Sequence, residues 1–149
     1  MQELPKDCHA IILVRMIQVT CDWKEKLQFE ISNSSAQTAL IDGNGATAIS
    51  PMEALLGALC SCMATDVVMV LEKMRTPPAS LKVVATGDRN PEPPRRYRRI
   101  ELSFVVSGDL KKERVEHAVQ LSFQTYCSVF HTLRRDIEIT HSIEVSPAR

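Results

Sequence analysis

The feature that most constrains the fold is a long apolar segment with the signals of a single helix. Ser50, Pro51 and Glu53 stand in the order of a helix start: a serine N-cap, a proline at the first helical position and an acidic residue placed for a capping box. Two consecutive prolines end the helix after about Arg75, since neither can donate an intrahelical hydrogen bond. Apolar and small residues cover every face between Glu53 and Asp66, so we expect other elements to enclose this helix.

Alternation of apolar and polar residues predicts strands on both sides of this helix. The predicted strands are residues 17–21, 27–31, 38–41, 81–86, 100–106 and 137–145. The first two have the pattern of a β-hairpin, and the third stops at turn-forming residues 42–45. Strands and helices are segregated along the chain, which favours an α+β fold over a parallel α/β sheet.

A second helix is predicted after residue 109, and its apolar stripe ends at Cys127. The stripe consists of Val115, Ala118, Val119 and Ser122. A further helical turn or two is expected over residues 128–134.

Length and composition limit the classes of protein to which the chain can belong. Its 149 residues fit one domain, which we expect at residues 16–149, with residues 1–15 as a leader or extension. Eighteen basic and eighteen acidic side chains cancel, so nucleic acid and anionic lipid gain no overall attraction. The longest uncharged stretch, residues 54–65, is shorter than the roughly 20 residues that span a membrane. Five irregularly spaced cysteines favour a reducing compartment, and we expect a cytoplasmic protein without membrane partners.

The densest charge cluster lies in the polar loop expected between residues 87 and 99. Its arginines are Arg89, Arg95, Arg96, Arg98 and Arg99. Phosphates held around Tyr97 are one interpretation. A solvated hairpin connection is the simpler one, because the charge is balanced elsewhere, and we expect no nucleic-acid partner.

Cysteine is the residue type with the clearest chemical potential in this chain. Cys60 and Cys62 lie two apart on the predicted helix and point about 200° apart, so they cannot form a disulfide with each other. Taken alone, Cys62 is a packing cysteine, because it lies three turns from the helix N-terminus and Asp66, one turn later, disfavours a thiolate. The four histidines show no zinc-motif spacing with the cysteines, and we predict neither a metal site nor a cofactor.

Several segments together resemble the OsmC/Ohr family, and within it the YhfA-like branch. The resemblance rests on residues 50–53, Cys62, and residues 66–68, 71–75, 126–129 and 139–142. The specific combination is a cysteine eleven positions after Pro51 with a second helical cysteine far downstream, Cys127. The match keeps a consistent order from about residue 17 to residue 145.

The resemblance implies both an architecture and a reaction. The architecture is an OsmC-like fold with antiparallel sheets around long central helices, assembled as an intertwined homodimer. The reaction is reduction of organic hydroperoxides in a stress response: Cys62 attacks the peroxide and becomes a sulfenic acid, and Cys127 resolves it to a disulfide. An external thiol or dithiol then restores both. Glu53 and Asp66 are candidate supporting residues.

The sequence also departs from the family pattern. Met52 stands where the best-characterised members place a glutamate that organises an activating arginine, and only Arg15 offers itself as that arginine. Two alternatives to a peroxide reductase therefore stay open: a non-catalytic dimer that binds a small apolar or electrophilic ligand, and a redox sensor. Cys60 is expected to have a packing role.

Overall fold

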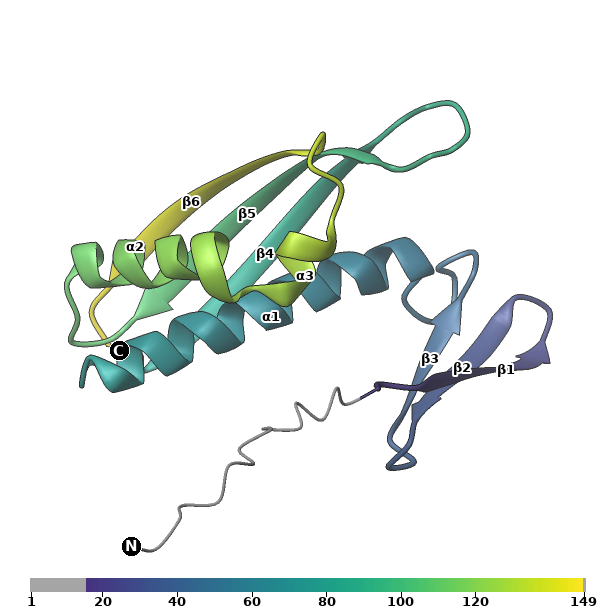
Figure 1. The fold of residues 1–149 in the computed structure, drawn as a ribbon, viewed down its shortest axis with the longest axis horizontal. Coiled ribbons are helices and arrows are strands. Elements are labelled where there is room, and N and C mark those ends of the chain that lie inside the picture. The colour runs from purple at the N-terminus through teal and green to yellow at the C-terminus, as the bar shows by residue number, and fades with distance from the viewer. Residues whose placement is uncertain (1–15, 149) are drawn as a thin grey trace, which may run out of the picture. The chain divides into compact units, whose positions relative to one another are not determined.

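The computed structural model describes residues 16–148, which form two compact units, residues 16–48 and residues 49–148 (Figure 1). The first unit is an antiparallel sheet in the order β1 (Val19–Glu25), β2 (Gln28–Asn33) and β3 (Thr38–Asp42). The second unit contains, in chain order, α1 (Pro51–Lys73), β4 (Ser80–Arg89), β5 (Tyr97–Ser107), α2 (Lys112–Leu121), the π-helical turn η1 (Ser122–Tyr126), α3 (Ser128–Thr132) and β6 (Glu138–Ser146). The leader expected at residues 1–15 lies outside the described residues.

The first unit confirms the predicted hairpin and turn. β1 and β2 pair with Cys21 opposite Ile31, and the connecting turn includes Lys26 at φ 49°. After β3, the carboxylate of Asp42 accepts hydrogen bonds from the N–H of Asn44 and from the N–H and hydroxyl of Thr47. These donors lower the pKa of Asp42 and fix the turn.

α1 begins as the sequence predicts. The Ser50 N–H donates to Glu53 Oε2 at 2.7 Å and the Glu53 N–H donates to Ser50 Oγ at 3.3 Å, which completes the capping box. Because its carboxylate accepts hydrogen bonds from the Ser50 hydroxyl and the Ser50 N–H, the pKa of Glu53 is lowered. The helix ends at Lys73, and Arg75 turns the chain at φ 58° ahead of the two prolines.

The sheet of the second unit is mixed. β4 pairs antiparallel with β5, whereas β5 pairs parallel with β6. The expectation of wholly antiparallel sheets is therefore wrong for this pair. The reason is that the chain between β5 and β6 contains α2, η1 and α3, a connection long enough for the crossover that parallel neighbours require.

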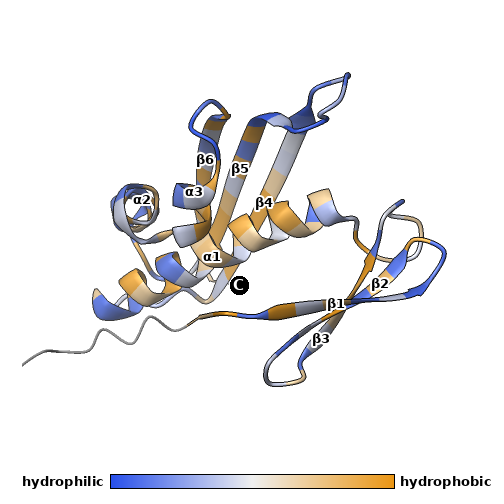
Figure 2. Cartoon of the chain, turned by 45° about the vertical axis from the view of Figure 1, so that its right-hand side comes forward, coloured by the Kyte–Doolittle hydropathy of each residue, from blue (hydrophilic) through white to orange (hydrophobic). Residues whose placement is uncertain are grey.

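One face of this sheet and one stripe of α1 form the core. The three helices lie on the same face of the sheet (Figures 1 and 2), and buried apolar residues of the helices and of the sheet form one core cluster. The buried residues of α1 are Leu59, Met63, Val67, Val70 and Leu71. The facing residues of β5 are Ile100, Leu102, Phe104 and Val106, and the predicted stripe of α2 is buried as well.

The second unit by itself does not enclose α1 on every side. Leu55 and Met69 are 38% and 49% exposed, on faces that the second unit leaves uncovered. Among residues 16–148, α1 is also the one helix long and apolar enough to cross a membrane by length and composition, with 28% of its most apolar window buried. Core helices pass the same test, so the finding carries little weight.

The arginine-rich loop is shorter than predicted because both strands extend into it. Tyr97 is the first residue of β5 and only 4% exposed, and its hydroxyl donates to the Met52 carbonyl at 2.8 Å. Its ring lies against Gly87 so closely that a Cβ there would collide with it. The ring and hydroxyl of Tyr97 are therefore engaged within the core and are not available to a phosphate.

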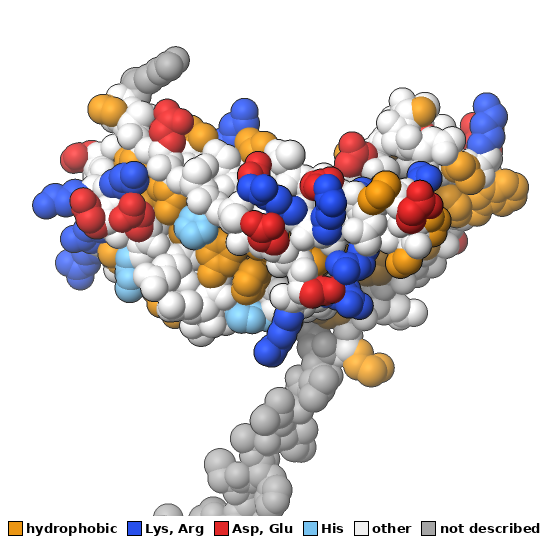
Figure 3. Space-filling view, turned by 90° about the horizontal axis from the view of Figure 1, so that it is seen from above, with side chains coloured by type: hydrophobic (Ala, Val, Ile, Leu, Met, Phe, Trp, Pro, Cys, Tyr) orange, Lys and Arg blue, Asp and Glu red, His pale blue; other side chains and the backbone are white. Residues whose placement is uncertain are grey.

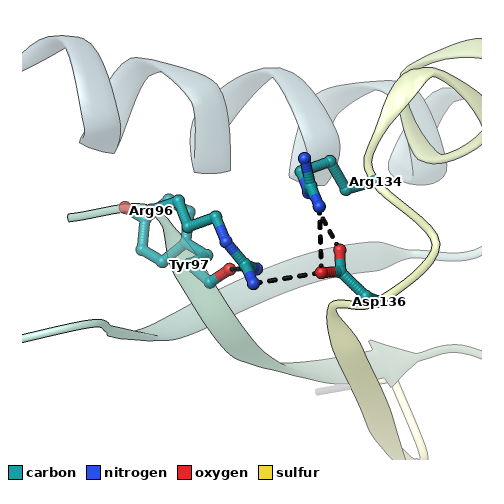
Figure 4. Close-up of polar contacts among 4 residues, drawn as sticks. All are labelled: Arg96, Tyr97, Arg134 and Asp136. Atoms are coloured by element: carbon teal, nitrogen blue, oxygen red, sulfur yellow. Dashed lines mark hydrogen bonds and ion pairs between the residues drawn. The ribbon is translucent and has the colours of Figure 1, made fainter. Parts of the chain in front are cut away.

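Three of the five loop arginines, Arg96, Arg98 and Arg99, pair with acidic residues. Arg96 and Arg134 both donate to Asp136 (Figure 4), and Arg98 pairs with Asp88 at 2.7 Å. Figure 3 shows basic and acidic side chains of the described residues interspersed over one face. These pairs support the interpretation of the loop as a solvated hairpin connection.

Candidate functional site

α1 carries two of the candidate residues on the same side. Cys62 and Asp66 are one turn apart, so the helical period brings their side chains to neighbouring positions. Both are half-buried. Their position in the middle of a long, well-packed helix fixes their backbones.

The third residue, Cys127, is positioned by an irregular helix. After α2 the chain winds into the π-helical turn η1, in which the Cys127 N–H donates to the Ser122 carbonyl at 2.9 Å. Cys127 then caps α3, and its Sγ accepts a hydrogen bond from the Phe130 N–H at 3.4 Å. π-Helical turns are rare and frequently occur at functional sites. This one brings the Cys127 thiol into the core, where it is fully buried.

These elements bring three reactive groups together. The sulfurs of Cys62 and Cys127 and a carboxylate oxygen of Asp66 all lie within 4.8 Å of one another. The buried Ser122 hydroxyl donates to Asp66 Oδ2 at 2.7 Å and holds the carboxylate toward the thiols. Every cysteine within residues 16–148 is a free thiol, so the pair is in its reduced form.

The surroundings of Cys127 keep its thiol protonated. Burial is the main cause that raises its pKa, to about 12, and the neighbouring Cys62 and Asp66 act in the same direction. The N–H of Phe130 acts against them by stabilising the anion. At neutral pH the buried sulfur is therefore a poor initial nucleophile, whereas it remains close enough to react with an oxidised neighbour.

Glu53 lies away from this cluster. It is nine residues before Cys62, or about 13 Å along the helix axis, and its carboxylate is engaged in the capping box. Met52, at the position of the family glutamate, packs against the core. Arg15 lies outside the described residues. Cys60 also packs against the core, and burial raises the pKa of its thiol.

Sequence reasoning missed Ser122 as a site residue. It was placed in the apolar stripe of the second helix, and it is indeed buried there, but its hydroxyl is the partner of Asp66. The available signal was the polarity of a serine inside an otherwise apolar stripe, because a buried hydroxyl needs a hydrogen-bond partner.

A surface hollow of about 1060 Å³ lies beside α2, α3 and β6. Its lining includes the rings of Phe123, Phe130 and His141. The ring centroid of Phe123 lies 5.0 Å from that of Phe130 and 5.0 Å from that of His141. Phe130 also donates its backbone N–H to the Cys127 sulfur, whereas Cys62, Asp66 and Cys127 themselves do not line the hollow.

Two free thiols are thus held between a central helix and a π-helical turn in a two-layer α+β unit. The chain belongs to the OsmC-like protein family, which matches residues 43–142. It is 42% identical over 134 residues to Protein YhfA of Escherichia coli K12, a match that covers 89% of this chain and 100% of that protein. The resemblance predicted from the sequence is thereby confirmed.

Solved structures share the fold. A hypothetical protein of Aquifex aeolicus VF5 is 27% identical with a TM-score of 0.83, over 91% of this chain and 99% of that one. The organic hydroperoxide resistance protein OhrB of Bacillus subtilis is 14% identical with a TM-score of 0.58, over 89% and 98% of the two chains. The α+β, OsmC-like fold expected from the sequence is confirmed.

Proposed function

We propose that this protein reduces organic hydroperoxides in the cytoplasm as part of a stress response, with Cys62 and Cys127 as its redox pair. The observation that carries the proposal is the convergence of two free thiols within 4.8 Å, from elements far apart in sequence. Family membership supports a stress-related peroxide role, since structural relatives from Bacillus subtilis and Elizabethkingia anophelis are organic hydroperoxide resistance proteins.

Exposure and charge assign the order of events. Cys62 is half-buried and reachable by a small oxidant, whereas Cys127 is fully buried and has a raised pKa. The Cys62 thiolate attacks a peroxide oxygen, the O–O bond breaks, and the alcohol leaves with a proton. Cys62 is then a sulfenic acid. Cys127 attacks its sulfur, the S–S bond forms, and the hydroxyl leaves with the thiol proton as water.

Asp66 is the supporting residue in this scheme, and Glu53 is structural. The Asp66 carboxylate, held by Ser122, is suited to accept the proton that Cys127 releases as it attacks and to pass it to the leaving hydroxyl. The disulfide is reduced afterwards by an external thiol or dithiol, so no cofactor is required.

A homodimer is part of the proposal. α1 is apolar on faces that the second unit leaves exposed, including Leu55 and Met69. A second copy of the chain would bury these faces, and it would complete the surroundings of a thiol that is half-buried in one chain.

The test is peroxide consumption by single-cysteine variants. Cys62→Ser should abolish turnover of an alkyl hydroperoxide, and Cys127→Ser should leave a sulfenic acid on Cys62 that a dimedone-type probe traps. Cys60→Ser is the matched control on the same helix and should keep wild-type turnover. Retained activity in Cys62→Ser, or oxidation confined to Cys60 in the wild type, would overturn the mechanism.

A second candidate function is binding of a small apolar ligand, favoured by the hollow that Phe123, Phe130 and His141 line. The same assay separates the candidates. An enzyme consumes hydroperoxide in many-fold excess over protein, a redox sensor stops after one equivalent, and a ligand binder consumes none.

A further inference from the structure

We propose that the reduced protein binds one zinc ion per chain through Cys62, Asp66 and Cys127. The sequence predicted no metal site, because the histidines show no zinc-motif spacing with the cysteines. The structure instead assembles two sulfurs and a carboxylate, a donor set that suits Zn²⁺, from two separate segments of the fold.

The distances fit a tetrahedral ion. With Zn–S bonds of about 2.3 Å, two sulfurs in a tetrahedral site lie about 3.8 Å apart, and a sulfur and a carboxylate oxygen about 3.5 Å apart. The three donor atoms already lie within 4.8 Å of one another, so side-chain rotations that close the set by about 1 Å suffice. Three protein ligands leave the fourth position open, as in zinc sites that keep a water or small ligand.

The groups around the donors are those that support a ligand set. Ser122 donates to Oδ2 of Asp66, which fixes the carboxylate and leaves Oδ1 for the ion. The Phe130 N–H donates to the Cys127 sulfur and stabilises its negative charge. Both supporting groups belong to the irregular segment of η1 and α3, so the same local structure that brings in Cys127 also orients it.

Charge gives the reason for binding. Two thiolates and a carboxylate within 4.8 Å would repel one another, so Cys127 keeps its proton in the free protein. A divalent cation that displaces this proton is attracted by all three negative groups. Cys62 and Asp66 are half-buried, so an ion has a route to the buried Cys127. Binding releases the thiol protons to solvent and changes no oxidation state.

The consequence is a competition at one pair of sulfurs. Zinc occupies both thiolates, so a zinc-loaded protein has no free nucleophile for a peroxide. Oxidation to a disulfide removes both anionic ligands and therefore releases the ion. Bound zinc would therefore lower the reactivity toward peroxide, and oxidation would lower the affinity for zinc.

The experiment is a titration of the reduced full-length protein with Co²⁺ under anaerobic conditions and without peroxide. We expect one cobalt per chain, with thiolate-to-cobalt charge-transfer and tetrahedral visible bands that added zinc removes. Cys62→Ser and Cys127→Ser should each lose the wild-type charge-transfer band. Cys60→Ser and Cys21→Ser, the matched controls, should retain it. Asp66→Asn should weaken zinc binding, and Ser122→Ala should weaken it roughly 10- to 100-fold.

Several outcomes would refute the assignment: no band, a wild-type band in Cys62→Ser, or equal loss in Cys60→Ser. Circular dichroism of each variant separates loss of binding from loss of folding, and Ser122→Ala tests the site without touching a ligand. The titration does not depend on peroxide chemistry. A cobalt band in a protein that fails to consume hydroperoxide would leave this inference intact and remove only the proposed function.

Discussion

Alkaline pH should destabilise this protein through a single buried thiol. In the folded chain the pKa of Cys127 is raised from 9.0 to about 12, chiefly by burial. In the unfolded chain the thiol is hydrated and loses its proton near its ordinary pKa. Between these values the folded state holds one more proton than the unfolded state, so the free energy of unfolding falls as pH rises.

The size of the effect follows from the two pKa values. With an unfolded pKa of 9.0 and a folded pKa of about 12, linkage gives a loss of about 1.4 kcal/mol between pH 8 and pH 10. Full burial of the side chain means that solvent does not screen this loss. Lysines, tyrosines and Cys60 also titrate in this range, so the effect has to be measured as a difference between two proteins.

The assay is urea unfolding of the wild type and of Cys127→Ser, with a phosphine reductant, at pH 8, 9 and 10. The stability of the wild type relative to the variant should shrink by about 1.4 kcal/mol across the series. A difference that stays constant to pH 10 would refute the argument. If the variant does not fold, the rate of alkylation of Cys127 in the native protein is measured instead. This rate should rise tenfold per pH unit up to at least pH 10, with no plateau near 9.

Three further predictions follow from the fold. Gly87→Ala should cost about 1–3 kcal/mol in urea unfolding, because the new Cβ collides with the Tyr97 ring; combining it with Tyr97→Leu should recover part of the loss. Ser50→Ala should cost about 1 kcal/mol through the lost cap, whereas Glu53→Gln should leave hydroperoxide turnover unchanged; a large loss of turnover at unchanged melting would instead make Glu53 part of the site. Sedimentation at micromolar concentration should give a dimer, and a folded monomer would contradict the covering of α1 by a second chain.

Local signals account for the parts of the fold that the sequence predicts well. Three residues close together in the sequence specify the start of α1: Ser50, Pro51 and Glu53. They form the N-cap and the first helical turn. The parallel pairing of β5 with β6 was not predicted, because alternation within a strand does not specify its neighbour. Tyr97 was assigned to a loop because arginines and prolines surround it, whereas a distant contact with Gly87 places it in the core.

The candidate site divides in the same way. The helical period alone puts Cys62 beside Asp66. Nothing local predicts that Cys127 reaches them, since this depends on the packing of α2 and η1 against α1; only the family resemblance suggested the pair. Ser122 could not be distinguished from a small packing residue until its partner was known.

The position of Cys127 depends on the number of residues in the π-helical turn η1. Deleting any one residue between Ser122 and Tyr126 would restore ordinary winding and rotate the following residues by about 100°. Cys127 would then face away from Cys62, although every reactive side chain would still be present. Over evolutionary time the residues of this segment other than Ser122 should therefore accept substitutions, but the segment should not accept insertions or deletions. The exposed connection between β4 and β5 is free to vary in length.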